Sequence, residues 1–260
     1  MSPTPTRPAP LMAYEPVQWL ADDSPRSTRF DDVYRSRAGA LLQAQTVFLD
    51  GCQLGELWRE QQQCTILETG FGLGINFLAT WAAWQADPQR CQHLHFISIE
   101  AYPVAGEDIV RSAQTLQPPG TSAAAHQASV AALGQQLAGA WRGLHQGVQT
   151  LHFAHGQVQL TLAIGDVLPM LQQITASADA VYLDGFSPAR NPQMWSPATL
   201  QAVAQRCHPG TRLASYSSAG AVRRGLTAVG FEVQRRPGLA PKWQRLEARY
   251  SLARRAGSDR

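Results

Sequence analysis

The sequence predicts a doubly wound α/β fold, in which a mixed sheet carries helices on both of its faces. From residue 64 onward, short apolar and β-branched runs alternate with segments whose apolar residues recur at helical spacing. Three alternating glycines follow the first of these runs. The chain has 260 residues, of which 44% are hydrophobic and 16% are charged. It is therefore long enough to bury the core of one such domain.

The elements are assigned in chain order, beginning after an irregular N-terminal extension. Residues 1–28 are rich in proline and serine and predict a disordered or extended lead-in. The first sixty residues as a whole are expected to be irregular, with an apolar patch at residues 46–49. The run at residues 64–68 is the first predicted strand. The next helix, strand and two helices are predicted over residues 77–84, 94–100, 105–116 and 122–144.

The second half of the chain continues this alternation. Residues 148–153 and 158–164 flank His155 and Gly156 and predict a hairpin. The strand, helix, strand and helix that follow are predicted over residues 180–184, 197–207, 211–216 and 219–229. The last two strands, predicted over residues 231–235 and 246–252, indicate an antiparallel edge of a mixed sheet. We therefore expect a single domain over residues 29–252 and a basic tail over residues 253–260.

Composition excludes several classes of protein. No apolar run is long enough to span a membrane, and the N-terminus lacks the apolar segment of a signal peptide. The four cysteines are scattered without metal-binding spacing, which argues against a disulfide scaffold and against a structural zinc site. We expect a reduced, cytoplasmic protein that binds neither a membrane nor a metal ion.

Charge is distributed unevenly along the chain. The net charge is +3, but twelve basic and only three acidic residues occur from residue 206 onward. Clustered arginine of this kind is expected of a protein with a phosphate-rich partner. A solubilising C-terminal segment explains the same charges equally well.

The glycine-rich stretch Glu68-Thr-Gly-Phe-Gly-Leu-Gly74 follows a predicted strand and precedes a predicted helix. Its spacing is GxGxG, which differs from the GxGxxG of dinucleotide-binding proteins. Free backbone amides and the helix N-terminus favour an anion there, such as the methionyl carboxylate of S-adenosylmethionine. The acid that opens the stretch, Glu68, suits the cationic sulfonium of that cofactor and would be unfavourable beside a pyrophosphate.

Two further acids are expected near this loop. Glu100 ends the second predicted strand, where a carboxylate can accept hydrogen bonds from both ribose hydroxyls. Asp166 follows the hairpin and could meet an adenine amino group, although capping of the next helix is an alternative role. Together with the glycines, these acids favour a nucleoside-type cofactor.

The fourth parallel strand ends in an unusual loop, Asp184-Gly-Phe-Ser-Pro-Ala-Arg-Asn-Pro-Gln-Met-Trp195. Its prolines, glycine and asparagine predict a rigid, non-helical connection. Asp184 offers a carboxylate at the mouth of the cofactor site. Phe186, Met194 and Trp195 offer exposed faces on which a planar base can stack, and the alternative for Trp195 is packing in the core.

These stretches resemble the methyltransferase domain of the bifunctional tRNA 5-methylaminomethyl-2-thiouridine biosynthesis proteins and its free-standing relatives. The similar segments are residues 30–36, 47–49, 68–78, 184–195 and 216–226. The resemblance implies a class I, Rossmann-like methyltransferase fold. It also implies methylation, with S-adenosylmethionine, of the amine of 5-aminomethyl-2-thiouridine at the wobble position of tRNA. The chain shows no second glycine fingerprint, so no FAD chemistry is assigned to it.

The resemblance and the residues together give a set of candidate site residues. Asp184 is the candidate proton acceptor for the amine, and Phe186 is expected to wall the pocket. The residues expected to bind the cofactor are Glu68, Gly70, Phe71, Gly72, Gly74, Asn76, Glu100, Asp166 and Asp184. The residues expected to bind the anticodon region of tRNA are Arg190, Asn191, Met194, Trp195, Arg223, Arg224, Arg235, Arg236 and Lys242. One of the adjacent Arg223 and Arg224 is expected to be structural, because they cannot face the same way on a helix.

The chain departs from the family pattern at Gln43, Gln45, Cys52 and residues 238–243, which lie outside the cofactor loop. Three other functions therefore stay open, namely a methyltransferase of small amines, a nicotinamide oxidoreductase and a non-catalytic RNA-binding relative. If the chain acts on tRNA, a separate FAD-dependent or aminomethyl-forming enzyme is the partner that supplies its substrate.

Overall fold

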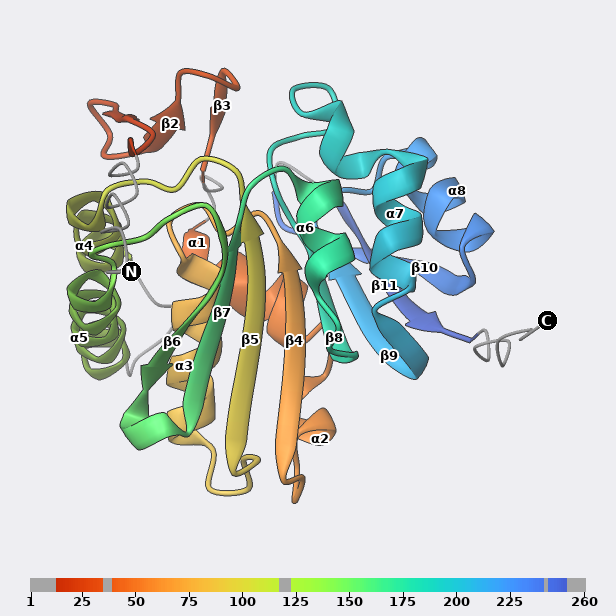
Figure 1. Cartoon of the computed structure of the whole chain (residues 1–260), viewed down its shortest axis with the longest axis horizontal. Coiled ribbons are helices and arrows are strands. Elements are labelled where there is room, and N and C mark those ends of the chain that lie inside the picture. The colour runs from red at the N-terminus through yellow and green to blue at the C-terminus, as the bar shows by residue number, and fades with distance from the viewer. Residues whose placement is uncertain (1–12, 35–38, 117–122, 241–242, 252–260) are drawn as a thin grey trace, which may run out of the picture.

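A computed structural model of the chain describes residues 13–34, 39–116, 123–240 and 243–251. Its centre is an eight-stranded mixed sheet with the strand order β10-β11-β9-β8-β4-β5-β7-β6 (Figure 1). The strands are β4 (Gln63–Thr69), β5 (His93–Glu100), β6 (Gly147–Phe153), β7 (Val158–Ile164), β8 (Ala178–Leu183), β9 (Cys207–Ser215), β10 (Phe231–Pro237) and β11 (Gln244–Tyr250). The predicted α/β class is confirmed.

Strand direction brings the candidate site residues to one edge of this sheet. β4 pairs in parallel with β5 and β8, β5 with β7, and β8 with β9. The carboxyl ends of parallel strands meet at the same edge, so the segments that follow these strands lie close together. β6, β10 and β11 run antiparallel to their neighbours, as the sequence predicted for the hairpin and for the last two strands.

Helices cover both faces of the sheet (Figure 1). One face carries α3 (Ile75–Ala86), α4 (Gly106–Thr115) and α5 (Ala123–Ala140), and the other carries α6 (Val167–Gln173), α7 (Pro197–Ala204) and α8 (Gly220–Ala228). α3 is buried on nearly all sides, because its Phe77 and Trp81 pack with Phe153 against the sheet. α7 begins with a side-chain cap, since Ser196 Oγ accepts a hydrogen bond from the backbone N–H of Thr199 at 3.1 Å.

The expectation of an irregular N-terminal region is wrong for the described residues. A small antiparallel sheet contains β1 (Val17–Trp19), β2 (Pro25–Ser27) and β3 (Asp32–Val33). It is followed by α1 (Ala40–Gln43), a π-helix η1 (Ala44–Leu49) and α2 (Leu54–Leu57). Phe48 of η1 is fully buried and packs on Tyr182 of β8 at a ring distance of 5.0 Å. These elements are too short to give a periodic signal, so the sequence revealed only the apolar patch.

The small sheet lies across the carboxyl-terminal edge of the central sheet (Figure 1). The backbone N–H of Glu15 donates to the carbonyl of Pro103, and Trp19 Nε1 donates to Asp108 of α4 at 2.7 Å. The guanidinium of Arg111, also on α4, lies 4.2 Å from the Trp19 ring centroid. The start of the predicted lead-in and the predicted basic tail, residues 1–12 and 252–260, lie outside the described residues. None of the described helices combines the length and apolarity needed to cross a bilayer.

Candidate active site

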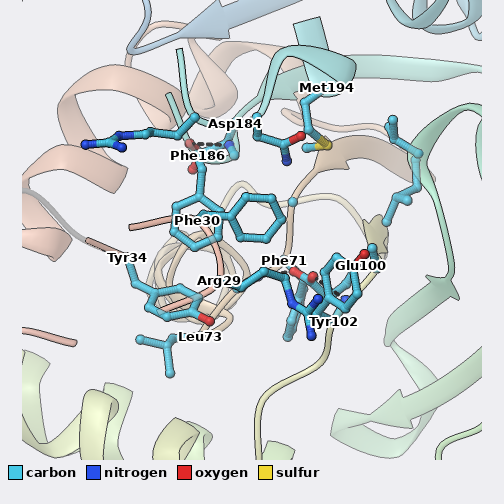
Figure 2. Close-up of a pocket in the computed structure, with 18 of the residues that line it drawn as sticks. Arg29, Phe30, Tyr34, Phe71, Leu73, Glu100, Tyr102, Asp184, Phe186 and Met194 are labelled. Carbon is cyan, nitrogen blue, oxygen red and sulfur yellow. Dashed lines mark hydrogen bonds between the residues drawn. The ribbon is translucent and has the colours of Figure 1, made fainter. Parts of the chain in front are cut away.

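A cavity of about 400 Å³ opens at the carboxyl-terminal edge of the sheet (Figure 2). Its walls come from segments that are far apart in the sequence, around residues 29–34, 70–76, 99–102, 165–167 and 184–194. This is the edge at which open α/β sheets bind their ligands. The fold therefore brings the glycine loop, the acids after β5 and β7 and the loop after β8 onto one cavity, as the sequence predicted.

The backbone of the glycine loop packs directly against the backbone of the segment that follows β8. Gly70, Gly72 and Gly74 have φ angles of +86°, +52° and +72°, a region that residues with a Cβ atom rarely adopt. A Cβ atom added to Gly70 would lie 3.0 Å from the Cα atom of Gly185. Glycine at position 70 thus allows the loop to lie directly against the residue that follows Asp184.

The amide groups of this loop are largely used within the protein. The N–H groups of Gly70 and Phe71 donate to the carbonyl of Ile99, and Gly74 N–H donates to the carbonyl of Phe71. Gly72 N–H donates to the Glu100 carboxylate at 2.8 Å. The expectation of free loop amides waiting for an anion is therefore wrong at these four positions, because the end of β5 accepts three of these hydrogen bonds and the loop itself accepts the fourth.

Glu100 ends β5, and its carboxylate lines the cavity. Besides Gly72 N–H it accepts the Tyr102 N–H at 2.8 Å. Burial raises the pKa of Glu100, and the backbone hydrogen bonds partly oppose that shift. Asp166 also lines the cavity at the start of α6, and its side chain makes no capping hydrogen bond, contrary to the alternative role. Both acids lie where the sequence placed them.

Glu68 lies behind the cavity and does not line it. Its side chain is 1% exposed, and it accepts hydrogen bonds from Ser98 Oγ at 2.6 Å and from Asn76 Nδ2 at 2.8 Å. Burial raises the pKa of Glu68 well above its usual range, and the charge of Asp184 adds to the shift. The expected direct contact with a cofactor therefore does not fit the geometry of Glu68.

Asp184 follows β8 and lines the same cavity as the glycine loop. Its Oδ1 accepts the Gly185 N–H at 2.8 Å, and its Oδ2 accepts Asn76 Nδ2 at 2.7 Å. Its backbone is also fixed, because the Thr69 hydroxyl donates to the Asp184 carbonyl at 2.8 Å. A carboxylate held in this way can accept a proton from a ligand in the cavity.

The N-terminal sheet supplies a cover for the cavity that sequence reasoning missed. Phe30 stacks on Phe186 at a ring distance of 4.7 Å, and Tyr34 meets Phe186 edge-on at 5.1 Å. Figure 2 shows Arg29 beside Tyr102, and its guanidinium lies 4.1 Å from that ring centroid. The buried Glu15 forms an ion pair with Arg29 at 3.0 Å. The sequence signal for this cover was the similarity of residues 30–36 to the family.

The cover is joined to the loop that carries Asp184. Asp32 Oδ2 accepts the Ser187 N–H at 3.0 Å, and Asp31 forms an ion pair with Arg190 at 3.1 Å. Together with the Phe30–Phe186 stack, these contacts connect the N-terminal sheet to residues 186–190. The cover and the loop therefore form one continuous wall opposite the glycine loop.

The residues predicted to bind RNA separate into two groups. Arg190, Asn191 and Met194 line the cavity, as does the candidate wall residue Phe186. Trp195 does not offer a face for stacking, because it is 7% exposed and donates its Nε1–H to the Phe186 carbonyl at 2.9 Å. Its ring meets Tyr216 edge-on, so the core role is the one that the structure supports.

The C-terminal arginines lie outside the lining of the cavity. Arg224 of α8 is exposed and Arg223 is half-buried, which agrees with the expectation that the two face different ways. Arg235 and Arg236 are exposed on β10, and Arg236 pairs with Glu247 at 3.2 Å. Lys242 lies outside the described residues. The charge of Arg236 is thus partly used within the fold.

The structure shows what surrounds two of the positions that depart from the family pattern. Gln43 of α1 lines the cavity. Cys52 is fully buried, with its Sγ 3.7 Å from the Val181 carbonyl, and burial raises the pKa of its thiol. The departure at residue 43 can therefore act on the ligand directly, whereas the departure at residue 52 acts only through packing.

The chemistry of the cavity fits S-adenosyl-L-methionine. The glycines keep the loop free of side chains, and a Cβ atom at Gly72 would already lie 3.3 Å from the Tyr34 ring. Glu100 offers a carboxylate for a diol, since a carboxylate can accept about four hydrogen bonds and the backbone N–H groups do not use all of them. The carboxylates of Glu100, Asp166 and Asp184 suit a cationic ligand. Among the described residues, no three His, Cys, Asp or Glu side chains are grouped as a metal site requires.

Comparison with known proteins agrees with this chemistry. Residues 128–251 match the model of a family described as S-adenosyl-L-methionine-dependent methyltransferase. The chain is 51% identical, over 91% of its length, to the tRNA 5-methylaminomethyl-2-thiouridine biosynthesis bifunctional protein MnmC of Acidovorax sp. (strain JS42). It is 50% identical, over 92% of its length, to the protein of the same name from Paracidovorax citrulli (strain AAC00-1). These matches cover 35% and 36% of the relatives, so the chain spans about a third of their length.

A solved structure supports the fold. The crystal structure of MNMC2 from Aquifex aeolicus superposes with a TM-score of 0.70 and covers 94% of this chain and 73% of that one. The two sequences are 22% identical, so this likeness concerns the architecture alone. The mixed sheet with helices on both faces is the architecture that the resemblance implied.

Proposed function

We propose that this chain, a homologue of the methyltransferase domain of the tRNA 5-methylaminomethyl-2-thiouridine biosynthesis bifunctional proteins, methylates the amine of 5-aminomethyl-2-thiouridine at the wobble position of tRNA. Its methyl donor is S-adenosyl-L-methionine. One observation carries the proposal: Asp184, the carboxylate after β8, lines the same cavity as the glycine loop. A proton acceptor and a methyl donor can therefore meet at one point.

The amine substrate sets the chemical task of this site. An alkylamine is mostly protonated near neutral pH, and its ammonium form has no lone pair with which to attack. Asp184 accepts a proton from the amine and holds the nitrogen in place by a hydrogen bond. When bound, S-adenosyl-L-methionine would supply an electrophilic methyl group to this nitrogen, with a neutral thioether as the leaving group. Asp184 thus provides general base catalysis, and the walls of the cavity provide most of the acceleration through proximity.

The remaining lining residues orient the two ligands. The turn at Gly70, Gly72 and Gly74, together with Phe71, lies against the methionyl end of the cofactor and contacts it without the N–H groups of these residues, which donate within the protein. Glu100 accepts hydrogen bonds from the ribose hydroxyls, and Asp166 lies where it can meet the adenine amino group. Phe186, stacked on Phe30, closes the cavity on the substrate side and keeps water away from the reacting atoms.

The RNA has to present its wobble base to the cavity in a splayed conformation. Arg190, Asn191 and Met194 lie at the cavity, where they contact that base and its own phosphate. Arg223, Arg224, Arg235, Arg236 and Lys242 contact the more distant phosphates of the anticodon region. A separate FAD-dependent or aminomethyl-forming enzyme supplies the substrate amine, and the reaction takes place in the cytoplasm.

The proposal is tested by incubating the protein with a radiolabelled methyl donor and undermodified total tRNA, followed by nucleoside analysis. We expect the label in 5-methylaminomethyl-2-thiouridine. Asp184→Asn keeps the size of the side chain and removes the base, so turnover falls by about 10²- to 10⁴-fold. Asp179→Asn is the matched control, because Asp179 lies near the start of β8, whose end Asp184 follows, and it bonds to Thr65 N–H and His208, away from the cavity. Near-normal turnover by Asp184→Asn would remove Asp184 from its proposed role.

A methyltransferase of small amines is the second candidate. It is favoured by one observation, namely that the C-terminal arginines lie outside the cavity while three carboxylates line it. A gel-shift titration with bulk tRNA separates the two functions. Binding that weakens steeply with salt supports the RNA substrate. Methylation of a free amine by a protein that does not bind tRNA supports the second candidate.

A further inference from the structure

A chain of hydrogen bonds runs behind the cavity and ends on Asp184. Ser98 Oγ on β5 donates to Glu68 Oε2 on β4 at 2.6 Å. Asn76 Nδ2, in the first turn of α3, donates to Glu68 Oε1 at 2.8 Å and to Asp184 Oδ2 at 2.7 Å. Glu68 and Asn76 are 1% and 9% exposed, so the chain of bonds is shielded from solvent.

The bonding pattern fixes which way the Asn76 amide points. An asparagine side chain has two N–H donors on its nitrogen and an acceptor oxygen, whereas an ionised carboxylate only accepts. The Nδ2 group lies between two carboxyl groups and gives one hydrogen to each. A reversed amide would place its oxygen against Asp184 and lose that donor. Glu68, itself held by Ser98, therefore determines the orientation of the amide that Asp184 receives.

We propose that Asn76 is a positioning residue for methyl transfer, which fixes the Asp184 carboxylate against the cavity, and that Glu68 and Ser98 fix the Asn76 amide. This inference rests on the proposed function, because it supports the base assigned there. It also replaces the expected role of Glu68 as a direct cofactor ligand, because Glu68 is absent from the lining of the cavity. Asn76 does line the cavity, but its two N–H donors are given to the Glu68 and Asp184 carboxylates.

The Asn76 N–H donor also changes how readily the Asp184 carboxylate takes up a proton. A hydrogen bond to an ionised carboxylate favours the ionised form, so the loss of Asn76 favours protonated Asp184. Among the described residues, the charge of Asp184 interacts with Glu68 of β4 and with Tyr216 after β9. A second negative charge beside Glu68 is disfavoured, and the N–H donors of Asn76 and Gly185 both favour ionised Asp184.

A matched control lies one turn further along α3. Thr80 Oγ1 and the Tyr182 hydroxyl of β8 are 3.1 Å apart and both side chains are fully buried. This pair joins the same helix to the same strand as Asn76 and Asp184 do, but it does not reach the cavity. Thr80→Val thus reports the cost of losing a buried bond between α3 and β8 without altering Asp184.

The experiment compares Asn76→Ala, Thr80→Val and the unmodified chain. The titration midpoint of the Asp184 carboxyl carbon is followed by NMR in protein labelled at aspartate, with Asp184→Asn to assign the signal. We expect Asn76→Ala to raise this midpoint by about one pH unit, and Thr80→Val to leave it unchanged. In the methylation assay, Asn76→Ala lowers kcat about ten- to hundredfold and moves the acid limb of the pH–rate profile to higher pH. The cofactor dissociation constant stays within about threefold, since both N–H donors of the amide are used by Glu68 and Asp184.

Each outcome decides a different question. An unchanged Asp184 midpoint in Asn76→Ala overturns the positioning role, and so does a cofactor affinity that falls in parallel with kcat. If the unmodified chain binds the cofactor but labels no RNA, the proposed function fails, while the NMR midpoint still tests the hydrogen-bond chain. Should Asn76→Ala not fold, Asn76→Ser keeps a small polar side chain in the first turn of α3 and carries the same comparison.

Discussion

Replacement of Gly70 by alanine tests the closest approach in the active site. Gly70 has a φ angle of +86°, and a left-handed conformation costs a residue with a Cβ atom about 1–2 kcal/mol. The new Cβ atom would also lie 3.0 Å from Gly185 Cα and 3.3 Å from the Asp184 carbonyl oxygen. Both atoms belong to the backbone that carries Asp184, so that backbone has to move by a few tenths of an ångström.

The two effects have separate readouts. For a chain of this size, each kcal/mol lowers Tm by about 2–4 °C, so the strain alone predicts a loss of about 2–8 °C. Movement of the proposed base acts on turnover, because misplacement of a reacting group by about 1 Å can cost about 100-fold in rate. We therefore expect Gly70→Ala to lower kcat by about ten- to hundredfold in the tRNA methylation assay while the protein stays folded at 25 °C.

Substitutions at two other glycines are controls that separate backbone strain from the crowding that a Cβ atom causes at Gly70. Gly156 has the same φ angle of +86°, but a Cβ atom added there would meet nothing within 4 Å, so Gly156→Ala should lower Tm similarly and keep full activity. Gly139 is exposed on α5 with open space around it, and Gly139→Ala should leave Tm unchanged or raise it slightly. If Gly70→Ala is as active as Gly156→Ala, the close approach of the two loops does not position the base.

Two further predictions concern the cover and the buried acid. Phe30→Leu removes the ring that stacks on Phe186, a contact worth about 0.5–1.5 kcal/mol. We expect this substitution to raise KM for tRNA about two- to tenfold without changing cofactor affinity. An unchanged KM argues against the cover as a substrate wall. Glu68→Gln should stabilise the protein increasingly as pH rises. Burial raises the pKa of folded Glu68 above the value of about 4.3 in the unfolded chain, so the wild type loses stability between those two values and the glutamine variant does not. Urea unfolding at several pH values measures this difference, and a difference that stays constant from about pH 4.5 to 8 contradicts it.

The edge of the sheet at which the site lies could be predicted from the sequence because it follows from strand direction alone. Strand runs at residues 64–68, 94–100 and 180–184 end in Glu68, Glu100 and Asp184. Parallel strands place their carboxyl ends together whatever the details of packing. The positions of Glu100 and Asp184 on the cavity therefore needed no knowledge of tertiary contacts, and both predictions of place are confirmed.

The cover could not be predicted in the same way. Its strands have two or three residues, too few for alternation to show. Its contacts with the loop after β8 join residues more than 150 positions apart, as in Phe30 with Phe186. Trp195 shows the same limit. The sequence left an exposed stacking ring and core packing both open, and the short helix η3 (Pro192–Trp195) turns that ring onto Tyr216. In both cases the outcome depends on which distant side chain fills a given space.

The alternation of side chains along β4 decides the role of Glu68, which the glycine motif alone leaves open. Glu68 stands in register with Ser98 of β5 and Tyr182 of β8, and side chains in register point to the same face of the sheet. Tyr182 meets Thr80 of α3, so that face is the one covered by α3. The carboxylate of Glu68 must therefore enter the layer between sheet and helix, although the motif places it two residues from the loop. In that layer its partner is Asn76, and through Asn76 an acid that does not line the cavity acts on Asp184, which does.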